Sequence, residues 1–235
     1  MNTLTLKRTY LDLTTPHVAD AIMRLGLPVR LAPTELRSLW SETHFVGRVR
    51  PVRHSGSVDV FLEAIAESEK GDVLIVDNEG RLDEACIGDL VTLEAKLAGI
   101  AGIVIWGLHR DTRELRTIRL PVFSLGSLPV GPQQLKRRDE DALLSASCGD
   151  ITVTAADFVL ADDDGVIFIP FERAQEVAEV ATKIRDTERY QASRMLLGQS
   201  FRQQAGFDSF LSAREQDPEL SFRQHLRQFG AEIEE

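Results

Sequence analysis

The apolar and polar positions of residues 71–106 predict a strand, a helix and a second strand. Residues 71–77 read GDVLIVD, an almost continuous apolar run that is typical of a buried strand. Residues 102–106 carry three consecutive β-branched positions and predict the second strand. Between them, apolar residues at helical spacing predict a helix that packs through one apolar face and stops at Gly99; this face consists of Leu90, Val91, Leu93, Leu97 and Ala98. The order of these elements predicts a crossover between parallel strands.

The same criteria predict further elements on both sides of this unit. Helices are expected at residues 16–25, 58–66 and 172–197, and in the polar tail near residues 219–229. Strands are expected at residues 45–53, 121–125, 151–154, 158–161 and 166–169. Residues 126–149 carry prolines and a run of charges, and we expect them to form a polar connector. The mixture predicts an α/β or β/β/α domain.

Two patterns that could suggest metal or redox chemistry have simpler interpretations. Residues 162–165 read DDDG, but they lack the spacing and the final Glu of a calcium-binding loop. We therefore expect an Asp-Gly hairpin turn there. Cys86 and Cys148 show no C-x-x-C spacing, so both are expected to be free thiols in a reducing compartment.

Composition limits the classes of partner. The chain has 235 residues, 43% of them hydrophobic, a formal net charge of -10 and a pI near 5.1. An acidic surface argues against nucleic-acid binding, which needs a basic face. The longest nearly apolar run, residues 99–108, is shorter than the roughly 18 residues that span a bilayer, and residues 1–13 lack a secretory apolar segment. We therefore expect a cytoplasmic protein that binds no membrane.

Three charged residues flank the predicted crossover. Asp89 lies at the start of the helix, and Arg110 and Asp111 follow the second strand. The loops at the carboxyl ends of parallel strands meet at one edge of a sheet, so these charges should converge. Two interpretations are open. An Arg-Asp pair can be an exposed ion pair and Asp89 a helix cap; alternatively, the carboxylates can hold Mg²⁺ and the guanidinium can polarise a keto oxygen.

The spacing of Asp89, Arg110 and Asp111 also resembles that of a known family. Asp89, twenty intervening residues and then Arg110-Asp111 resemble the D-x20-R-D signature of the family that contains class II 4-hydroxy-4-methyl-2-oxoglutarate aldolases and RraA-like proteins. Residues 15–26, 76–89 and 156–170 look like the family's opening helix, active-site loop and closing strand pair. The resemblance covers most of residues 12–190. It implies the swivelling β/β/α fold over residues 1-197, a C-terminal helical extension at residues 198-235, and assembly as a homotrimer or a dimer of trimers.

The resemblance also implies an activity and a site. It implies a divalent-metal-dependent lyase that cleaves pyruvate-derived 4-hydroxy-2-keto acids by a retro-aldol reaction, with oxaloacetate decarboxylation through the same pyruvate enolate. Asp111 would bind Mg²⁺ or Mn²⁺, Arg110 would stabilise the enolate oxygen, and Asp89 would order a water for proton transfer. The substrate carboxylate would be bound at the helix start, by the backbone of Gly88, Leu90 and Val91.

The same family implies a second possibility, a protein without catalytic activity that binds and inhibits a partner such as ribonuclease E. Aldolase-type members carry a late acidic residue that a neighbouring subunit contributes to the site, and inhibitor-type members lack it. Glu188 is the matching candidate here. An ordinary solvated helix residue is the alternative interpretation, because Arg185, Asp186 and Arg189 surround it.

Overall fold

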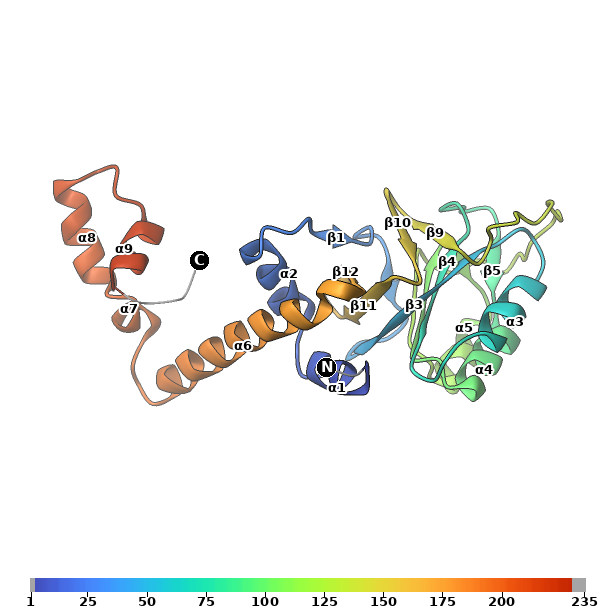
Figure 1. Ribbon diagram of the computed structural model, residues 1–235, viewed down its shortest axis with the longest axis horizontal. Helices are drawn as coiled ribbons and strands as arrows, with labels where there is room; N and C mark the ends of the chain where they lie inside the picture. The colour runs from blue at the N-terminus through green and yellow to red at the C-terminus, as the bar shows by residue number, and fades with distance from the viewer. Residues whose placement is uncertain (1–2, 230–235) are drawn as a thin grey trace.

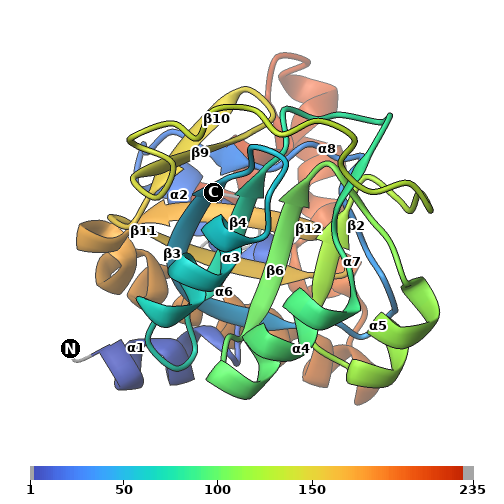
Figure 2. The same cartoon turned by 90° about the vertical axis from the view of Figure 1, so that its right-hand side faces the viewer.

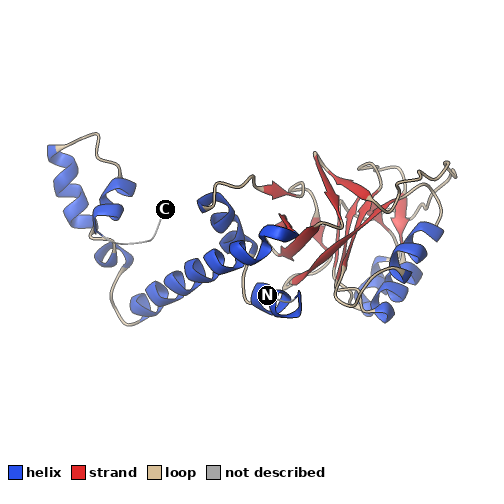
Figure 3. Cartoon of the chain, viewed as in Figure 1, coloured by secondary structure: helices blue, strands red, loops and turns tan. Residues whose placement is uncertain are grey.

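The computed structural model describes residues 3–229. Figure 1 shows an α/β body from which a long helix, α6 (Ala174–Leu196), leads to a separate group of helices at the far end of the molecule. Within the described residues, the body is built on an eight-stranded mixed sheet in the order β1-β12-β11-β3-β4-β6-β8-β2. One group of helices packs on each half of this sheet, and most strands lie between the two groups (Figure 3). The α/β class that the sequence predicts is therefore confirmed.

One half of the sheet is parallel. It contains β3 (Phe45–Arg53), β4 (Val73–Asp77), β6 (Gly102–Trp106) and β8 (Val122–Ser124). Three helices lie in front of these strands in Figure 2: α3 (Asp59–Ala66), α4 (Asp89–Ala98) and α5 (Thr112–Ile118). Buried Val, Ile and Leu side chains of the strands pack against these helices. The predicted strands 45–53 and 102–106 match β3 and β6, whereas α5 was not predicted.

The other half is antiparallel. There, β3 pairs with β11 (Asp157–Asp162), which forms a hairpin with β12 (Gly165–Pro170), and β1 (Arg30–Leu31) forms the edge. Asp162 pairs with Gly165, which confirms the predicted Asp-Gly turn. A second core lies between this half and its helices, which are α1 (Thr3–Tyr10), α2 (Thr15–Arg24), the short η1 (Phe171–Arg173) and α6. At the opposite edge, β2 (Arg37–Ser38) pairs with β8.

A third core fills the remaining face of the sheet, where a separate hairpin packs. The hairpin consists of β9 (Ser145–Cys148) and β10 (Ile151–Thr154). The prediction of a polar connector over residues 126–149 is therefore wrong at its end, because Ala146 and Cys148 alternate with polar residues and face this core. Cys86 and Cys148 are free thiols, as predicted, and both are buried. Burial raises the pKa of both thiols.

Helix α4 begins and ends as the sequence predicts but buries a different face. Gly99 follows its last residue in the left-handed conformation, with φ of 88°, which glycine adopts without strain. The buried positions are Val91, Thr92 and Ala95, whereas Leu90 and Leu97 are 76% and 74% exposed. Thr92 can be buried because its hydroxyl donates to the Gly88 carbonyl at 2.8 Å. The prediction is therefore wrong for the three leucines, whereas Val91 is buried and Ala98 packs against the core as expected.

The C-terminal group contains α7 (Phe201–Gln204), α8 (Phe207–Gln216) and α9 (Phe222–Phe229). The sequence predicted only the last of these. Phe210 and Phe222 pack edge to face, with ring centroids 5.0 Å apart, and Phe207 joins them. The division into domains at residues 1-197 and 198-235 stays a prediction, and its last residues, 230–235, lie outside the described part. No helix of residues 3–229 has the length and apolar character needed to cross a bilayer.

Candidate active site

Two loops meet at the carboxyl ends of the parallel strands. Each loop follows a short strand, β5 (Ala85–Ile87) or β7 (Leu108–His109), and these two strands pair in parallel. The Arg110 amide donates to the Ile87 carbonyl at 2.9 Å, which holds the start of one loop against the other. Neither strand was predicted, because two or three residues are too few to show a period. Through them, the two loops bring Asp89 next to the Arg110-Asp111 pair.

Asp111 adopts a backbone conformation that is uncommon for residues other than glycine. Its φ and ψ are 57° and 39°, in the left-handed region, immediately before helix α5. One carboxylate oxygen, Oδ2, accepts from the Asp89 amide at 3.2 Å and lies 3.5 Å from Arg110 Nε. Such conformations cluster at functional sites, because surrounding contacts must stabilise them. The backbone here directs the Asp111 carboxylate to the start of helix α4.

Gly88 makes this approach possible. A Cβ atom added at Gly88 would lie 2.3 Å from Asp111 Oδ2, closer than nonbonded atoms tolerate, and 3.2 Å from Arg110 Nε, which is a tight contact. The φ of Gly88 is -129°, which any residue can adopt, so the requirement concerns space and not backbone freedom. Any larger residue at this position would displace the carboxylate.

A third segment covers the arginine. The Ala85 amide donates to the Val130 carbonyl at 2.8 Å, so the chain after β8 runs beside β5. It brings Gly131 over the guanidinium, where an added Cβ would lie 2.7 Å from Arg110 Nη1. Sequence reasoning missed this contact because it assigned residues 126–149 to a polar connector without a role at the site. The available signal was the Gly131-Pro132 pair, a turn sequence within reach of the predicted sheet edge.

These segments enclose a cavity of about 150 Å³. Two of its lining side chains are charged, those of Asp89 and Arg110, and the others are apolar or glycine. The complete lining is Gly56, Val58, Ala85, Cys86, Gly88, Asp89, Leu90, Val91, Arg110 and Pro132. A charged end and an apolar wall suit a small organic acid.

The amides at the start of helix α4 are only partly available. The sequence predicted that the N–H groups of Leu90 and Val91 would both face a substrate carboxylate. The Leu90 amide donates to Asp89 Oδ1 at 2.8 Å, so it is already occupied. The Val91 amide has no hydrogen-bond partner within residues 3–229. One free donor at the positive end of a helix therefore remains for an anion.

The donor set fits a hard divalent cation. Within the described residues, no three His, Cys, Asp or Glu side chains gather into a metal-binding group. Mg²⁺ needs no such cage, since it commonly binds one or two carboxylates and completes its shell with waters and substrate oxygens. Asp111 is about one-third exposed, and its Oδ1 has no partner among residues 3–229. This oxygen can therefore bind a cation.

His109 supports the loop from below and is not exposed to the cavity. It is buried, with Nδ1 2.8 Å from Ser124 Oγ and Nε2 3.0 Å from Thr112 Oγ1. Burial lowers the pKa of this imidazole, so it is neutral near pH 7. Its contact with Thr112, the residue that follows Asp111, stabilises this part of the loop.

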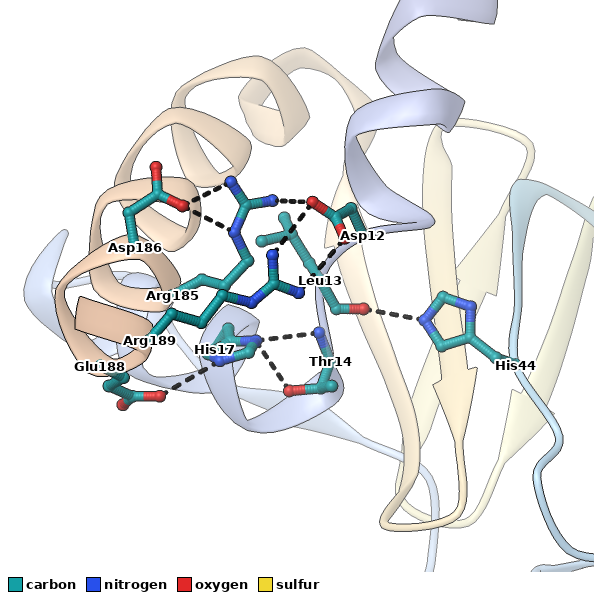
Figure 4. A network of polar contacts seen from close by, with 9 residues as sticks. All are labelled: Asp12, Leu13, Thr14, His17, His44, Arg185, Asp186, Glu188 and Arg189. Atoms are coloured by element: carbon teal, nitrogen blue, oxygen red, sulfur yellow. Dashed lines mark hydrogen bonds and ion pairs between the residues drawn. The ribbon is translucent and has the colours of Figure 1, made fainter. Parts of the chain in front are cut away.

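Glu188 lies in α6, on the antiparallel half of the body, and α4 and α5 cover the other half (Figure 1). Its Oε2 accepts from His17 Nε2 at 3.2 Å, and Thr14 donates to His17 Nδ1 (Figure 4). Nearby, Arg185 and Arg189 both bind Asp12. The structure thus brings together all the predicted site residues except Glu188, which faces α2 of its own chain. Its predicted contribution from a neighbouring subunit stays a prediction.

Comparison with known proteins assigns the chain to a family and agrees with its fold. The RraA-like family model, described as Aldolase/RraA, matches residues 15–168. The chain belongs to this family. The crystal structure of Streptomyces coelicolor RraAS2, described as an unusual member of the RNase ES inhibitor RraA protein family, is similar with a TM-score of 0.71 and 27% identity. That similarity covers 81% of this chain and 96% of RraAS2, which confirms the expected RraA-like fold.

Curated relatives also match by sequence, and two of them are informative. A Halalkalibacterium halodurans protein named "Putative 4-hydroxy-4-methyl-2-oxoglutarate aldolase" is 32% identical over 149 residues, which are 63% of this chain and 70% of that protein. Protein DlpA of Legionella pneumophila is 36% identical over 120 residues, which are 51% of this chain. The match spans only 19% of DlpA, so it concerns a small part of that protein.

Proposed function

We propose that this protein is a divalent-metal-dependent lyase that cleaves 4-hydroxy-2-keto acids to pyruvate and a carbonyl product, with oxaloacetate decarboxylation as a second outcome. The observation that carries the proposal is the meeting of Arg110 and the start of α4 at one cavity, with the Asp111 carboxylate held beside it by the Asp89 amide. Membership of the Aldolase/RraA family and the aldolase name of the H. halodurans relative support it.

Each residue has a role that its position allows. The Val91 amide and the positive end of α4 bind the substrate carboxylate beside Gly88 and Leu90. When the bond between C3 and C4 breaks, its electrons move to the pyruvyl unit and the 2-keto oxygen becomes negative. Arg110 lines the cavity and stabilises this oxygen, which contributes roughly 3 kcal/mol. Asp89 holds the water that delivers a proton to C3, and the proton that the 4-hydroxyl group loses as the bond between C3 and C4 breaks passes to solvent. Asp111 holds Mg²⁺ or Mn²⁺, which when bound supplies a Lewis acid for the 2-keto oxygen.

The proposal includes Glu188 and an oligomer. We propose a homotrimer or a dimer of trimers in which α6 of one subunit brings Glu188 to the site of the next. Glu188 is 55% exposed, and its bond to His17 is a single contact on the surface. Such an exposed pair is weak, so assembly can replace it at little cost.

Pyruvate release tests the proposal directly. Purified protein is incubated with 4-hydroxy-2-keto acids or with oxaloacetate, in the presence of Mg²⁺, of Mn²⁺ or of EDTA. We expect pyruvate to form with either metal, to stop with EDTA and to return when excess Mg²⁺ is added, because the site offers oxygen ligands. Full turnover in EDTA would contradict the proposed requirement for a divalent metal ion. Absence of pyruvate from every substrate would contradict the lyase and favour the family's other class, an inhibitor that binds a partner protein.

A further inference from the structure

Helices α3 and α4 form the outer layer of the parallel half, and they carry exposed apolar side chains (Figure 2). On α4, Leu90, Leu93 and Leu97 follow one another at helical spacing and share one face. Val58 and Leu62 are exposed at the start of α3, which packs beside α4. These five residues are the α3–α4 face. Because Val58 and Leu90 also line the cavity, this face begins where the cavity opens. An exposed apolar patch of this kind marks a surface that binds a partner.

The other end of the molecule carries a second exposed apolar surface. All the buried residues of α6 belong to its first half, whereas its second half, the α6 arm (residues 185–196), extends away from the body (Figure 1). Glu188, Ala192 and Met195 lie on one face of this arm, because they are four and seven residues apart. Leu196, next to this face, is 90% exposed. The face that carries Glu188 therefore continues as an apolar surface.

The two surfaces match in length. Leu90 and Leu97 are seven residues apart, as are Glu188 and Met195, so each pair spans about 10.5 Å along its helix. When the α6 arm lies parallel to α4 with Glu188 at the opening of the cavity, Met195 reaches Leu97. The apolar part of the arm then covers the leucines of α4.

Their charges are also complementary. Helices α3 and α4 carry one lysine and four carboxylates, which are those of Asp59, Glu63, Asp89 and Glu94. Arg138 pairs with the two on α3, whereas Glu94 has no ion pair among residues 3–229. Residues 189–202, from the α6 arm to α7, contain three arginines and no acidic residue. Opposite charges favour the encounter of the two surfaces and fix their register.

The partner that fits is a second copy of this chain. Helix α4 and the α6 arm lie at opposite ends of one molecule, so the contact joins different chains (Figure 1). An interface between two different surfaces of identical chains is heterologous, and it closes into a ring when the rotation between subunits allows. Each chain then gives one arm and receives another.

We infer that the α3–α4 face binds the α6 arm of a neighbouring copy of this chain, and that this contact covers the open side of the cavity. The inference rests on the proposed function, because Glu188 at the cavity sets the register of the arm. It adds the surface that receives the arm and the apolar residues that hold it there.

Disulfide trapping tests the register. In the full chain, Leu97→Cys/Met195→Cys places one thiol on each surface, and the native Cys86 and Cys148 are buried. After mild oxidation, we expect covalent oligomers on a non-reducing denaturing gel. Their yield should be at least tenfold higher than from the matched pair Leu97→Cys/Tyr190→Cys, because Tyr190 is on another side of α6. Equal yields from the two pairs, or a comparable yield from Leu97→Cys or Met195→Cys alone, would overturn the inference.

Assembly provides a second test. Leu97→Glu and Leu196→Glu should each raise the dissociation constant of the oligomer at least tenfold, measured by sedimentation velocity over a range of protein concentrations. Leu144→Glu, a control at another exposed leucine, should leave it unchanged. A monomeric wild-type protein would overturn the inference. An effect of only one of the two test variants would do the same, because it would mean that like surfaces meet.

Neither readout requires turnover, so the inference and the lyase can fail separately. Trapping and assembly as expected, with no pyruvate from any substrate, would refute the lyase alone. Metal-dependent pyruvate release by a protein whose assembly neither Leu97→Glu nor Leu196→Glu weakens would refute the inference alone.

Discussion

The two halves of the sheet each hold an Arg-Asp pair, and the two pairs differ in what surrounds them. In the antiparallel half, Arg30 forms two hydrogen bonds with Asp157, whose Oδ2 also accepts from the Thr154 amide at 2.9 Å. The Asp157 side chain is 8% exposed. In the parallel half, Arg110 and Asp111 share one contact of 3.5 Å, and the Asp111 side chain is 35% exposed.

The difference separates a structural pair from a candidate site. Both carboxylate oxygens of Asp157 accept hydrogen bonds from other residues of the folded chain, so the Arg30–Asp157 pair stabilises the fold. Asp111 has a left-handed backbone, depends on the absence of a side chain at Gly88 and keeps Oδ1 without a partner among residues 3–229. A carboxylate held in this way gains a partner only when a ligand binds.

The largest expected effect comes from the two aspartates. Asp111→Asn should lower kcat by about 10³-fold or more, because the amide cannot replace a charged metal ligand, and should leave the melting temperature almost unchanged, because the residue is on an exposed loop. Asp157→Asn should have the opposite profile, with kcat retained and stability lowered by about 2 kcal/mol, because Arg30 loses its partner. Calorimetry and pyruvate assays on both variants measure the contrast. If both variants lost the same amount of activity and of stability, the distinction between a structural pair and a candidate site would be wrong.

The next largest effect concerns the guanidinium. Arg110→Lys keeps the charge but loses the planar set of donors, so kcat should fall by about 10²-fold. The matched change, Arg30→Lys, should leave kcat unchanged. An unaltered rate in Arg110→Lys would mean that this arginine is structural, like Arg30.

The sequence predicts those features of the two halves that depend on interactions between residues close together in the chain. The strands 45–53 and 102–106 and the limits of α4 follow from local patterns: β-branched runs and Gly99. The convergence of Asp89 with Arg110 follows from chain order, because parallel strands end at one edge. For these reasons the fold class and most of one site could be predicted.

The features that the sequence did not predict depend on contacts between distant segments. Thr92 lies on the buried face of α4, where sequence reasoning expected leucines, because its hydroxyl donates to the Gly88 carbonyl. Gly131 lies over Arg110 because the Val130 carbonyl accepts from Ala85, 45 positions away. The left-handed backbone of Asp111 is visible only in coordinates. Hydrophobic periodicity reports none of these.

A smaller effect should follow from a single added methyl group. Gly88→Ala places a Cβ against Asp111 Oδ2, so the carboxylate must turn away, and we expect kcat to fall by about tenfold or more with little change in melting temperature. Gly131→Ala should have a weaker effect, because the end of the long Arg110 side chain can move aside. A Gly88→Ala variant with wild-type metal affinity and rate would show that the position of Asp111 is not critical.

The antiparallel half contributes to catalysis only if Glu188 acts in another subunit. Glu188→Gln and Asp111→Asn homo-oligomers should each be impaired, and co-assembled hybrids should regain part of the activity, because some interfaces pair an intact Asp111 with an intact Glu188. Hybrids verified by mass spectrometry are assayed for pyruvate release. A fully active Glu188→Gln protein, or no recovery in verified hybrids, would limit the role of Glu188 to its contact with His17.

The smallest expected effect is a loss of stability in acid, which we attribute to a buried histidine of the parallel half, His54. His54 follows β3 and stacks on Phe61, Nδ1 donates to Asn78 Oδ1 at 2.8 Å, and Nε2 accepts from the Gly56 amide. A second proton would occupy Nε2 and break the Gly56 contact. Burial lowers the pKa of His54 in the folded state.

This direction fixes the sign of the pH dependence. The unfolded chain, in which His54 has its ordinary pKa of about 6.5, binds the proton more readily than the folded chain. The stabilisation is therefore complete above pH 6.5 and is lost as the pH falls towards the lowered pKa. Between pH 7 and pH 5, wild-type melting temperature should fall by about 2–4 °C more than that of His54→Gln. Parallel melting curves for the two proteins would show that the acid sensitivity arises elsewhere, and Gly56, which lines the cavity, would then be held independently of the His54 charge.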